Sequence, residues 1–519
     1  MIDHSVAELE TSSESQGRVW RLALVCCAIV VGVQMGFAPL ADPDLPSHLS
    51  VGESILARRS VPLVEPFAWT RIGAPYYAYS WLPQIVMFGL LRSGGPLALH
   101  LLAGVLGAAV VLASAAAARA FGLRPSGSAL FGVLAATVAL ETTPFLRPQM
   151  FMHAIVPLAW LCVALSRSER IESWVTCVAL VLLNALGASV HISFPVLAAP
   201  LVLFVAESPV RLKSVLLASA STLLGWMLSP YGTKWPSVFA LNFARNALTS
   251  YPPPAGELTP GFIISPWFGV ALAALPLVAV VRMRDDRQRL FYGTLWLAGL
   301  VAFSRMFKAL GPWWWCATPM ILVSIARLSR ASTAWVRRVF AALLVLATAA
   351  LAIPNVRIGA ATMRYEGGVV RRELPSLKGY ATEPAARWLE RNMQRGANGR
   401  LLTSFIYGSY LKWRVPSLSQ SIDGRTIFPD SAALPDAVAE RTVIHLGPWR
   451  SADVAVVPLT YPVALTLDAD ASWCRVGVAS PAPWDPSAPR AALWVRRAWW
   501  ATVRMASDSS RCGPVSERR

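Results

Sequence analysis

Charged residues are scarce in this chain. Only 15% of its 519 residues are Asp, Glu, Lys or Arg, whereas soluble domains contain about 25%. Hydrophobic residues make up 55% of the sequence, and the mean hydropathy is +0.49. These values exclude a wholly soluble chain, and the length leaves room for a large helical bundle in a membrane together with one further domain.

Several familiar motifs are also missing. The sequence contains no Gly-x-Ser-x-Gly elbow for a serine nucleophile, no glycine-rich phosphate loop and no Cys-x-x-Cys pair for a metal. Internal repeats are not evident. The net charge is +18, but the basic residues do not form one stripe with interleaved aromatic residues. The sequence therefore predicts no nucleic-acid partner.

Long apolar runs dominate the first two thirds of the sequence. Residues 1–17 are polar and are predicted to be a disordered cytoplasmic N-terminus. The runs that follow predict about eleven helical spans, near residues 20–40, 96–118, 126–142, 148–166, 172–188, 192–207, 212–229, 263–281, 290–304, 311–327 and 335–353. The run Trp81–Leu91 is shorter, and its length favours an interfacial or re-entrant helix.

Basic residues in the short loops set the predicted orientation. With the N-terminus in the cytoplasm, Arg119 and Arg124 fall in one short inside loop, and Arg167 and Arg170 fall in the next. Loops 41–95 and 230–262 then lie outside. An odd number of spans also places residues 354–519 outside, so the sequence predicts a multi-pass protein of the cell inner (plasma) membrane.

Residues 354–519 are predicted to form a soluble extracytoplasmic α/β domain. Thr382-Glu383-Pro384 is typical of a helix start. Arg400–Phe405 and Val454–Val457 read as strands. The expected fold is a polytopic α-helical membrane protein, with a transmembrane domain at 18–353 and this small α/β domain behind it.

Two carboxylates follow the first predicted span directly. Asp42 and Asp44 are two residues apart, with His48 close behind. Such a group is suited to binding a cation, and either carboxylate is suited to act as a general base for a hydroxyl group. The same pattern also fits polar residues at the point where a helix leaves the bilayer.

Four basic residues are predicted to lie at the outer face: Arg147, His191, Arg305 and Lys308. Because charge at bilayer depth is costly, such residues tend to line cavities or to pair. Together they are suited to binding a lipid-linked phosphate. Contact with phospholipid headgroups is the alternative.

The order of these motifs resembles that of bacterial multi-spanning membrane proteins of the GT-C glycosyltransferase-like superfamily. The resemblance covers most of residues 20–430. It rests on Asp42-Pro43-Asp44, His48-Leu49, Glu65-Pro66-Phe67, Trp81-Leu82, Arg147-Pro148-Gln149, His191, Pro230-Tyr231-Gly232, the Arg305 segment, Tyr407–Leu411 and Asp423-Gly424-Arg425.

The resemblance implies an inverting glycosyltransferase that takes its sugar from a polyprenyl-phosphate donor and acts on the outer face. It assigns the catalytic role, as base or in orienting the acceptor, to Asp42 or Asp44. Substrate binding falls to a larger set: His48, Glu65, Trp81, Arg147, His191, Arg305 and Lys308. The expected acceptor is an envelope glycan, lipid or protein, and the other expected partners are membrane lipids and envelope-assembly proteins.

The sequence departs from the family pattern near Trp81. Ser80 and Gln84 stand where relatives tend to have acidic residues, and Pro46-Ser47 stands where they tend to have two Trp. A divalent metal therefore stays open, as does a non-catalytic scaffold in envelope polysaccharide assembly. A transporter of a lipid-linked solute ranks last, because the two halves of the chain show no inverted repeat.

Overall fold

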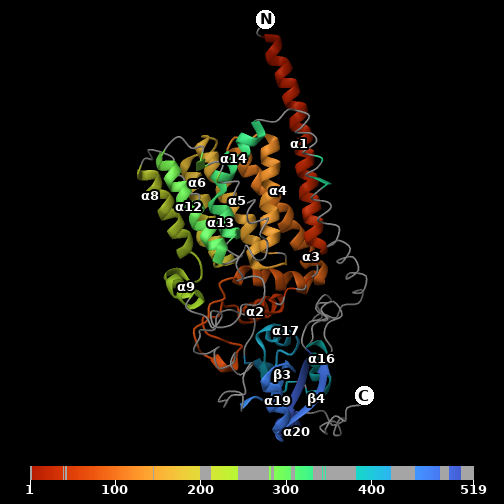
Figure 1. The fold of residues 1–519 in the computed structure, drawn as a ribbon. Helices are drawn as coiled ribbons and strands as arrows, with labels where there is room; N and C mark the ends of the chain where they lie inside the picture. The colour runs from red at the N-terminus through yellow and green to blue at the C-terminus, as the bar shows by residue number, and fades with distance from the viewer. Residues whose placement is uncertain are drawn as a thin grey trace. The chain divides into compact units, whose positions relative to one another are not determined.

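The computed structural model places most of its described residues in helices (Figure 1). It describes residues 3–38, 40, 42, 44–143, 145–198, 212–243, 277, 280–281, 286–305, 310–330, 342, 345–346, 382–394, 396–421, 451–479 and 490–503. The chain divides into two compact units. One consists of Met1–Ala38, Leu97–Thr233 and Pro253–Ala361, and the other of Pro39–Pro96, Lys234–Pro252 and Thr362–Arg519.

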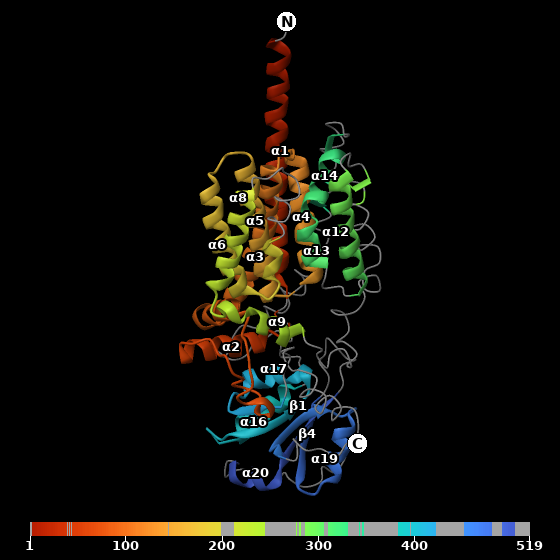
Figure 2. The same cartoon turned by 90° about the vertical axis from the view of Figure 1, so that its left-hand side faces the viewer.

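The first unit is a bundle of apolar helices. Its helices are α1 (Asp3–Phe37), the second part of α3 (Trp81–Ala120), α4 (Pro125–Thr142), α5 (Pro148–Arg167), α6 (Ser173–Val190), η2 (Phe194–Ala198), α8 (Leu212–Met227), α12 (Asp286–Arg305), α13 (Leu310–Cys316) and α14 (Thr318–Arg330). Helix α6 packs along both α5 and α8 (Figure 2). Helix α1 begins at Asp3, within the segment that the sequence predicts to be disordered.

Three helices among the described residues are long and apolar enough to cross a membrane: Gly17–Phe37, Trp81–Ala120 and Pro148–Arg167. Trp174–Val190 and Tyr292–Val301 are shorter apolar helices. The predicted runs at 263–281 and 335–353 lie almost entirely outside the described residues. The count of eleven spans therefore stays a prediction.

Proline and glycine decide where several helices begin. Pro125 and Pro148 occupy the first positions of α4 and α5, where the missing N–H of proline costs nothing. Within α3, Gly95 has a φ of 65° and a ψ of −165°, and Pro96 follows it. Few residues besides glycine adopt this conformation. It separates a first helix at Trp81 from a second at Pro96, and the two compact units divide at the same point.

Small residues let the bundle helices approach closely. A Cβ atom on Gly104 of α3 would lie 2.8 Å from the carbonyl oxygen of Gly32 in α1. A Cβ atom on Gly225 of α8 would lie 2.6 Å from the carbonyl oxygen of Val181 in α6. Close backbone contacts of this kind are typical of helix packing in membranes, where burial of apolar surface does not drive association.

The second unit contains a five-stranded sheet in the order β2-β1-β3-β5-β4. Its strands are β1 (Gly399–Thr403), β2 (Leu418–Gln420), β3 (Val454–Pro458), β4 (Trp473–Ala479) and β5 (Ala491–Arg496). β1 pairs in parallel with β2 and β3, whereas β5 pairs antiparallel with β3 and β4. A small sheet is therefore present in the C-terminal part of the chain, with strands at both expected places.

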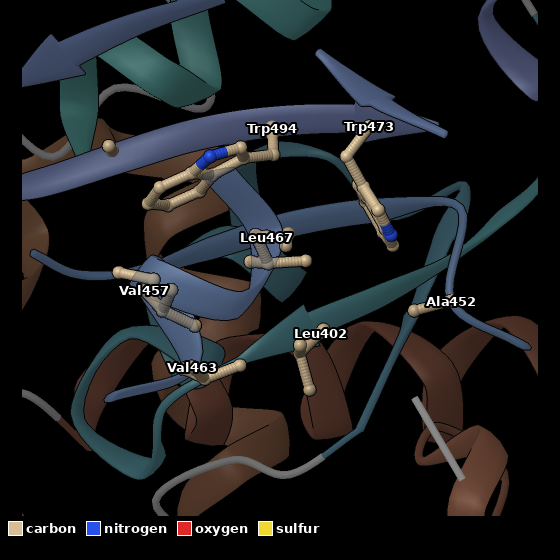
Figure 3. Close-up of a cluster of buried hydrophobic side chains, with 10 residues drawn as sticks. Leu402, Ala452, Val457, Val463, Leu467, Trp473 and Trp494 are labelled. Atoms are coloured by element: carbon tan, nitrogen blue, oxygen red, sulfur yellow. The ribbon is translucent and has the colours of Figure 1, made fainter. Parts of the chain in front are cut away.

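One face of this sheet carries a core of buried apolar side chains (Figure 3). Leu402, Val457 and Trp494 from the strands pack against Val463 and Leu467 of α19 (Pro462–Ala469).

The unit also holds α2 (Leu45–Arg58), η1 (Trp69–Arg71), α9 (Trp235–Phe243), α16 (Glu383–Asn392), α17 (Phe405–Arg414) and α20 (Arg497–Val503). The predicted helix after Thr382 is α16, with Pro384 in its first turn.

Candidate functional site

Asp42 and Asp44 lie in a tight turn that opens α2. Asp42 is completely buried, and its Oδ1 accepts a hydrogen bond from the backbone N–H of Asp44 at 3.1 Å. Its carbonyl oxygen accepts from the N–H of Leu45 at 3.2 Å. Asp44 is the N-cap residue of α2, and its carbonyl oxygen accepts from the N–H of His48 at 3.0 Å. The backbone therefore fixes where the Asp42 carboxylate lies.

Helix α2 crosses the first part of α3 at a glycine. A Cβ atom on Gly52 would lie 2.2 Å from the carbonyl oxygen of Gln84. One turn earlier in α2, His48 Nδ1 accepts a hydrogen bond from Gln84 Nε2 at 3.1 Å. The crossing thus joins His48, which follows the acidic turn, to the start of α3, where Trp81 lies.

Buried polar atoms without partners gather on these two helix starts. Ser47 and Ser80 are each 2% exposed, and Gln84 is 5% exposed. The atoms left without a hydrogen-bond partner are Ser47 Oγ, Ser80 Oγ, Trp81 Nε1 and Gln84 Oε1. A buried polar group left unsatisfied costs about 1–3 kcal/mol. Two hydroxyls, an indole N–H and an amide oxygen form a neutral set that is suited to the hydroxyl groups of a sugar.

Sequence reasoning treated Ser80 and Gln84 only as lost acidic residues and gave Ser47 no role. Ser47 lies in the first turn of α2, Gln84 lies in the first turn of α3, and Ser80 directly precedes α3. That position is the signal that could have identified them. The sequence does not predict that these side chains are buried, because their burial depends on the crossing of α2 and α3.

The Glu65 carboxylate shapes its own turn. Glu65 is 3% exposed, and its Oε1 accepts hydrogen bonds from the backbone N–H groups of Phe67 at 2.8 Å and Ala68 at 2.9 Å. Burial lowers the pKa of Arg71, and the nearby charge of Glu65 partly offsets this. These contacts give Glu65 a local structural role, and its predicted part in substrate binding stays a prediction.

The turn after Glu65 packs against the sheet. Trp69 Nε1 donates to the carbonyl oxygen of Leu401 at 3.2 Å, and Thr70 Oγ1 donates to the carbonyl oxygen of Ser421 at 2.6 Å. Ala68 and Gln420 form a parallel β-bridge. The loop that carries the acidic residues and the C-terminal sheet therefore belong to one compact unit.

Helix α17 extends this contact. The ammonium group of Lys412 lies 3.5 Å from the centroid of the Phe67 ring, and Trp413 meets Phe88 of α3 edge to face at 6.2 Å. Helix α17 also packs on α2. The sequence landmark Tyr407–Leu411 lies in this helix, whereas Asp423-Gly424-Arg425 lies outside the described residues.

Arg147 and His191 belong to the other unit, at helix ends. Arg147 is the N-cap residue of α5 and is 7% exposed. His191 is the C-cap residue of α6 and is 8% exposed. Its Nδ1 accepts the backbone N–H of Ser193 at 3.2 Å, so in the neutral ring the proton lies on Nε2. Arg305 ends α12, with only its backbone described, and Lys308 lies outside the described residues.

No group of three or more His, Cys, Asp or Glu side chains within the described ranges is arranged to hold a metal ion. Asp42 Oδ1 accepts the Asp44 N–H, and His48 Nδ1 accepts from Gln84. These two bonds engage one oxygen of the Asp42 carboxylate and one nitrogen of the His48 ring within the protein.

Comparison with solved structures shows what the fold resembles. The oligosaccharyltransferase of Archaeoglobus fulgidus, in its apo form, aligns with a TM-score of 0.56 at 13% identity, over 85% of this chain and 69% of that one. The arabinofuranosyltransferase AftD from Mycobacteria aligns with a TM-score of 0.52 at 18% identity, over 92% of this chain. The chain spans only 40% of the length of AftD.

Sequence comparisons add nothing to this result, since no protein-family model and no curated protein matches the chain. The structural neighbours are GT-C glycosyltransferases, as the order of the sequence motifs predicts. The chain therefore has a fold similar to that of these two glycosyltransferases.

The crossing at Gly52 yields a testable prediction. In Gly52→Ala, the new methyl group would meet the Gln84 backbone, which cannot move without separating α2 from α3. We expect a loss of stability of about 1–3 kcal/mol, as for other overpacked sites. Thermal unfolding of the purified protein in detergent would measure it.

Gly89→Ala is the matched control, because Gly89 lies in the first part of α3 and a Cβ atom there would meet nothing within 4 Å. Alanine in a helix interior is favoured over glycine by about 0.5–1 kcal/mol, so this variant should be at least as stable as the parent. Equal stability of the two variants would contradict the assigned crossing.

Proposed function

We propose that the chain is a membrane glycosyltransferase that moves a sugar from a polyprenyl-phosphate donor to an envelope glycan, lipid or protein acceptor on the outer face of the plasma membrane. The observation that carries the proposal is the buried Asp42 carboxylate, held by its turn at the start of α2, with unpartnered neutral polar atoms on the first turns of α2 and α3. The GT-C-like fold supports it.

In the proposed reaction, the oxygen of an acceptor hydroxyl attacks the anomeric carbon of the donor sugar. The bond from that carbon to the phosphate oxygen breaks, and the phosphate leaves with the electron pair. Asp42 or Asp44 takes the proton of the hydroxyl, which is general base catalysis. Displacement in line inverts the configuration at the anomeric carbon.

Two further sets of residues have proposed roles. Ser47, Ser80 and Gln84 offer hydrogen bonds to sugar hydroxyls, because Ser47 Oγ, Ser80 Oγ and Gln84 Oε1 are buried and have no hydrogen-bond partner in the structure. Arg147, His191, Arg305 and Lys308 are proposed to bind the donor phosphate. Cationic side chains that the fold already holds in position stabilise a leaving phosphate most effectively, because the protein does not have to rearrange as the negative charge develops.

A non-catalytic scaffold in envelope assembly is the second candidate. The observation that favours it is the neutral character of Ser80 and Gln84 beside Trp81, where relatives tend to have acidic residues. Under this alternative, the same neutral atoms bind a glycan without transferring it.

Lipids that co-purify with the protein separate the two candidates. Native mass spectrometry of the protein released from its membrane should detect a bound polyprenyl phosphate or polyprenyl-phosphate sugar. Phospholipid alone, together with another envelope protein at a fixed ratio, would instead support the scaffold. Turnover by the purified protein alone would exclude the scaffold.

A further inference from the structure

The order in which the chain adds parallel strands to the sheet reverses at β1. The chain leaves β1 through α17 to reach β2 on one side, and β3 lies on the other side. All three strands run in parallel, so their carboxyl ends meet at one edge. In open α/β sheets, ligands bind outside the carboxyl ends of the strands where the strand order reverses in this way.

Three buried polar side chains at this edge lack partners. Thr403 ends β1, Ser404 follows it, and Gln420 ends β2; each is 1% exposed. Thr403 Oγ1, Ser404 Oγ and Gln420 Oε1 have no hydrogen-bond partner. Buried polar atoms are nearly always satisfied in folded proteins, so three at one edge indicate an absent partner.

The strand register places two of them on the same face. Leu402 belongs to the same buried core cluster as Trp494 (Figure 3), so Leu401 and Thr403 point to the opposite face. Gln420 is paired with Leu401 in the parallel register and shares that face. Ser421 Oγ accepts the N–H of Thr403 at 3.1 Å and donates to its carbonyl oxygen at 3.2 Å, which ties the two strand ends together.

Helix α17 starts at the same point. Ser404 is its N-cap residue, and its carbonyl oxygen accepts the N–H groups of Tyr407 and Gly408. A serine at this position normally caps the helix with its hydroxyl, but the Ser404 side chain makes no such bond. The hydroxyl therefore stays available beside N–H groups that have no partner within the helix, at the positive end of the helix dipole.

We propose that this edge binds an oxyanion, either the phosphate or the carboxylate group of a small molecule. The hydroxyls of Thr403 and Ser404 donate to its oxygens, together with the first N–H groups of α17, as at other phosphate sites on helix starts. The Gln420 amide donates after rotation about its last bond, because its oxygen and nitrogen differ little in shape.

The turn at residues 65–71 contacts the same edge, since Ala68 pairs with Gln420 and Thr70 donates to the carbonyl oxygen of Ser421. The unpartnered atoms are covered, so entry of the anion requires a neighbouring segment to shift. Hydrogen exchange at residues 65–71 should therefore change when the anion binds.

Inorganic phosphate is the first probe, added to the full-length protein in detergent at constant ionic strength, with chloride as the reference salt. At about 100 times its Kd, phosphate should raise the unfolding temperature by about 5 °C. The double variant Thr403→Val with Ser404→Ala should weaken phosphate binding about tenfold or more. Without phosphate it should be at least as stable as the parent, because two unsatisfied hydroxyls are removed.

The matched control is Thr466→Val, whose hydroxyl donates to the Pro462 carbonyl oxygen within α19. It should keep the full response to phosphate. A parallel arm places the protein in nanodiscs with phosphatidylglycerol: a response that needs this lipid assigns the anion to a headgroup, whereas a response to phosphate in detergent assigns it to a soluble ligand. The proposal is overturned if neither probe acts, or if the double variant responds as the parent does.

Discussion

The variant Asp42→Asn combined with Asp44→Asn is expected to abolish sugar transfer while leaving the protein folded. General base catalysis contributes about 10²–10⁴-fold to a rate, so the loss should lie in that range or beyond. The turn should survive, because the amide oxygen of the substituted side chain can still accept the N–H that Asp42 Oδ1 accepts at 3.1 Å. Transfer from a lipid-linked donor in membranes, with protein abundance measured alongside, provides the test.

Single variants then decide between the two carboxylates. Asp42 is completely buried and Asp44 is partly exposed, so we expect Asp42→Asn to account for most of the loss. Asp470→Asn is the matched control: Asp470 Oδ1 accepts the N–H of Ser472 at 2.8 Å in the same kind of turn, but at an exposed site. Full transfer by the double variant at normal abundance would rule out the proposed catalytic role.

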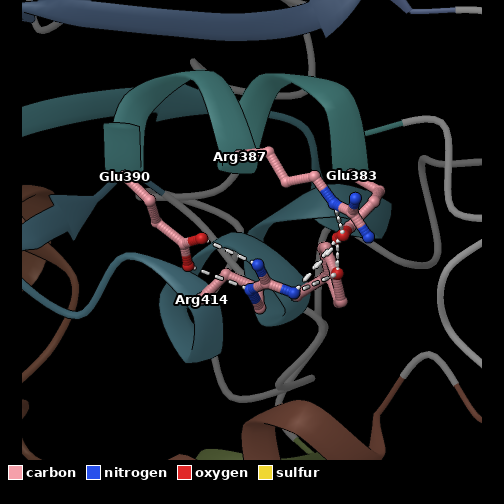
Figure 4. Close-up of polar contacts among 5 residues, drawn as sticks. Glu383, Arg387, Glu390 and Arg414 are labelled. Carbon is pink, nitrogen blue, oxygen red and sulfur yellow. Dashed lines mark hydrogen bonds and ion pairs between the residues drawn. The ribbon is translucent and has the colours of Figure 1, made fainter. Parts of the chain in front are cut away.

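The second large effect is expected at Arg414, which joins α17 to α16 (Figure 4). Its side chain is 3% exposed, with Nη1 3.3 Å from Glu383 Oε2 and Nη2 2.7 Å from Glu390 Oε2. Tyr410 donates to Glu383 as well. Burial acts to lower the pKa of Arg414, but its bond to Glu390 and the charges of Glu383 and Glu390 raise it overall.

Tyr410 keeps its proton in this network. Burial, and then the charge of Glu383, raise the pKa of its phenol well above the usual range. The neutral phenol therefore continues to donate to Glu383 throughout the neutral pH range. Because the folded-state pKa is raised, this contribution to stability is present below the ordinary pKa of tyrosine and is lost only as the pH rises above it.

Arg414→Met should destabilise the C-terminal domain by about 3–5 kcal/mol, since the buried Glu383 carboxylate loses its one buried cationic partner. It keeps only the bond from Tyr410 and the ion pair with Arg387, whose side chain is 40% exposed. A fall of about 10 °C in the unfolding temperature is expected. Arg475→Met is the control. Arg475 lies 2.8 Å from Asp468, but both side chains are about one-third exposed, and surface pairs contribute about 0–1 kcal/mol. Similar losses in the two variants would contradict the assigned role.

Local chemistry made much of the fold predictable. The prolines at 125, 148 and 384 mark helix starts, and the apolar runs between them are long enough for α4 and α5. The strands near Arg400 and Val454 and the break between Trp81–Leu91 and the next run could also be read from residue type. These features depend on the conformational preferences of neighbouring residues, which the sequence carries directly.

The site was less accessible to such reasoning. Asp42 and His48 are predicted as site residues because they are rare polar residues beside an apolar run. Glu65 has the same appearance, and both carboxylates accept backbone N–H groups of their own turns: one for Asp42 and two for Glu65. Residue type does not distinguish a carboxylate that binds a ligand from one that accepts hydrogen bonds from its own backbone. The difference depends on which N–H groups surround the carboxylate in the folded chain.

The sequence by itself determined the membrane class of this protein, the order of its motifs, the small α/β domain and the acidic turn before α2. Only the tertiary structure decided that Trp69 contacts Leu401, more than 300 residues away, and that Gly52 brings Gln84 to His48. It alone decided which polar atoms are buried without partners. Burial and pairing depend on segments that meet only when the chain has folded, and no local pattern records those meetings.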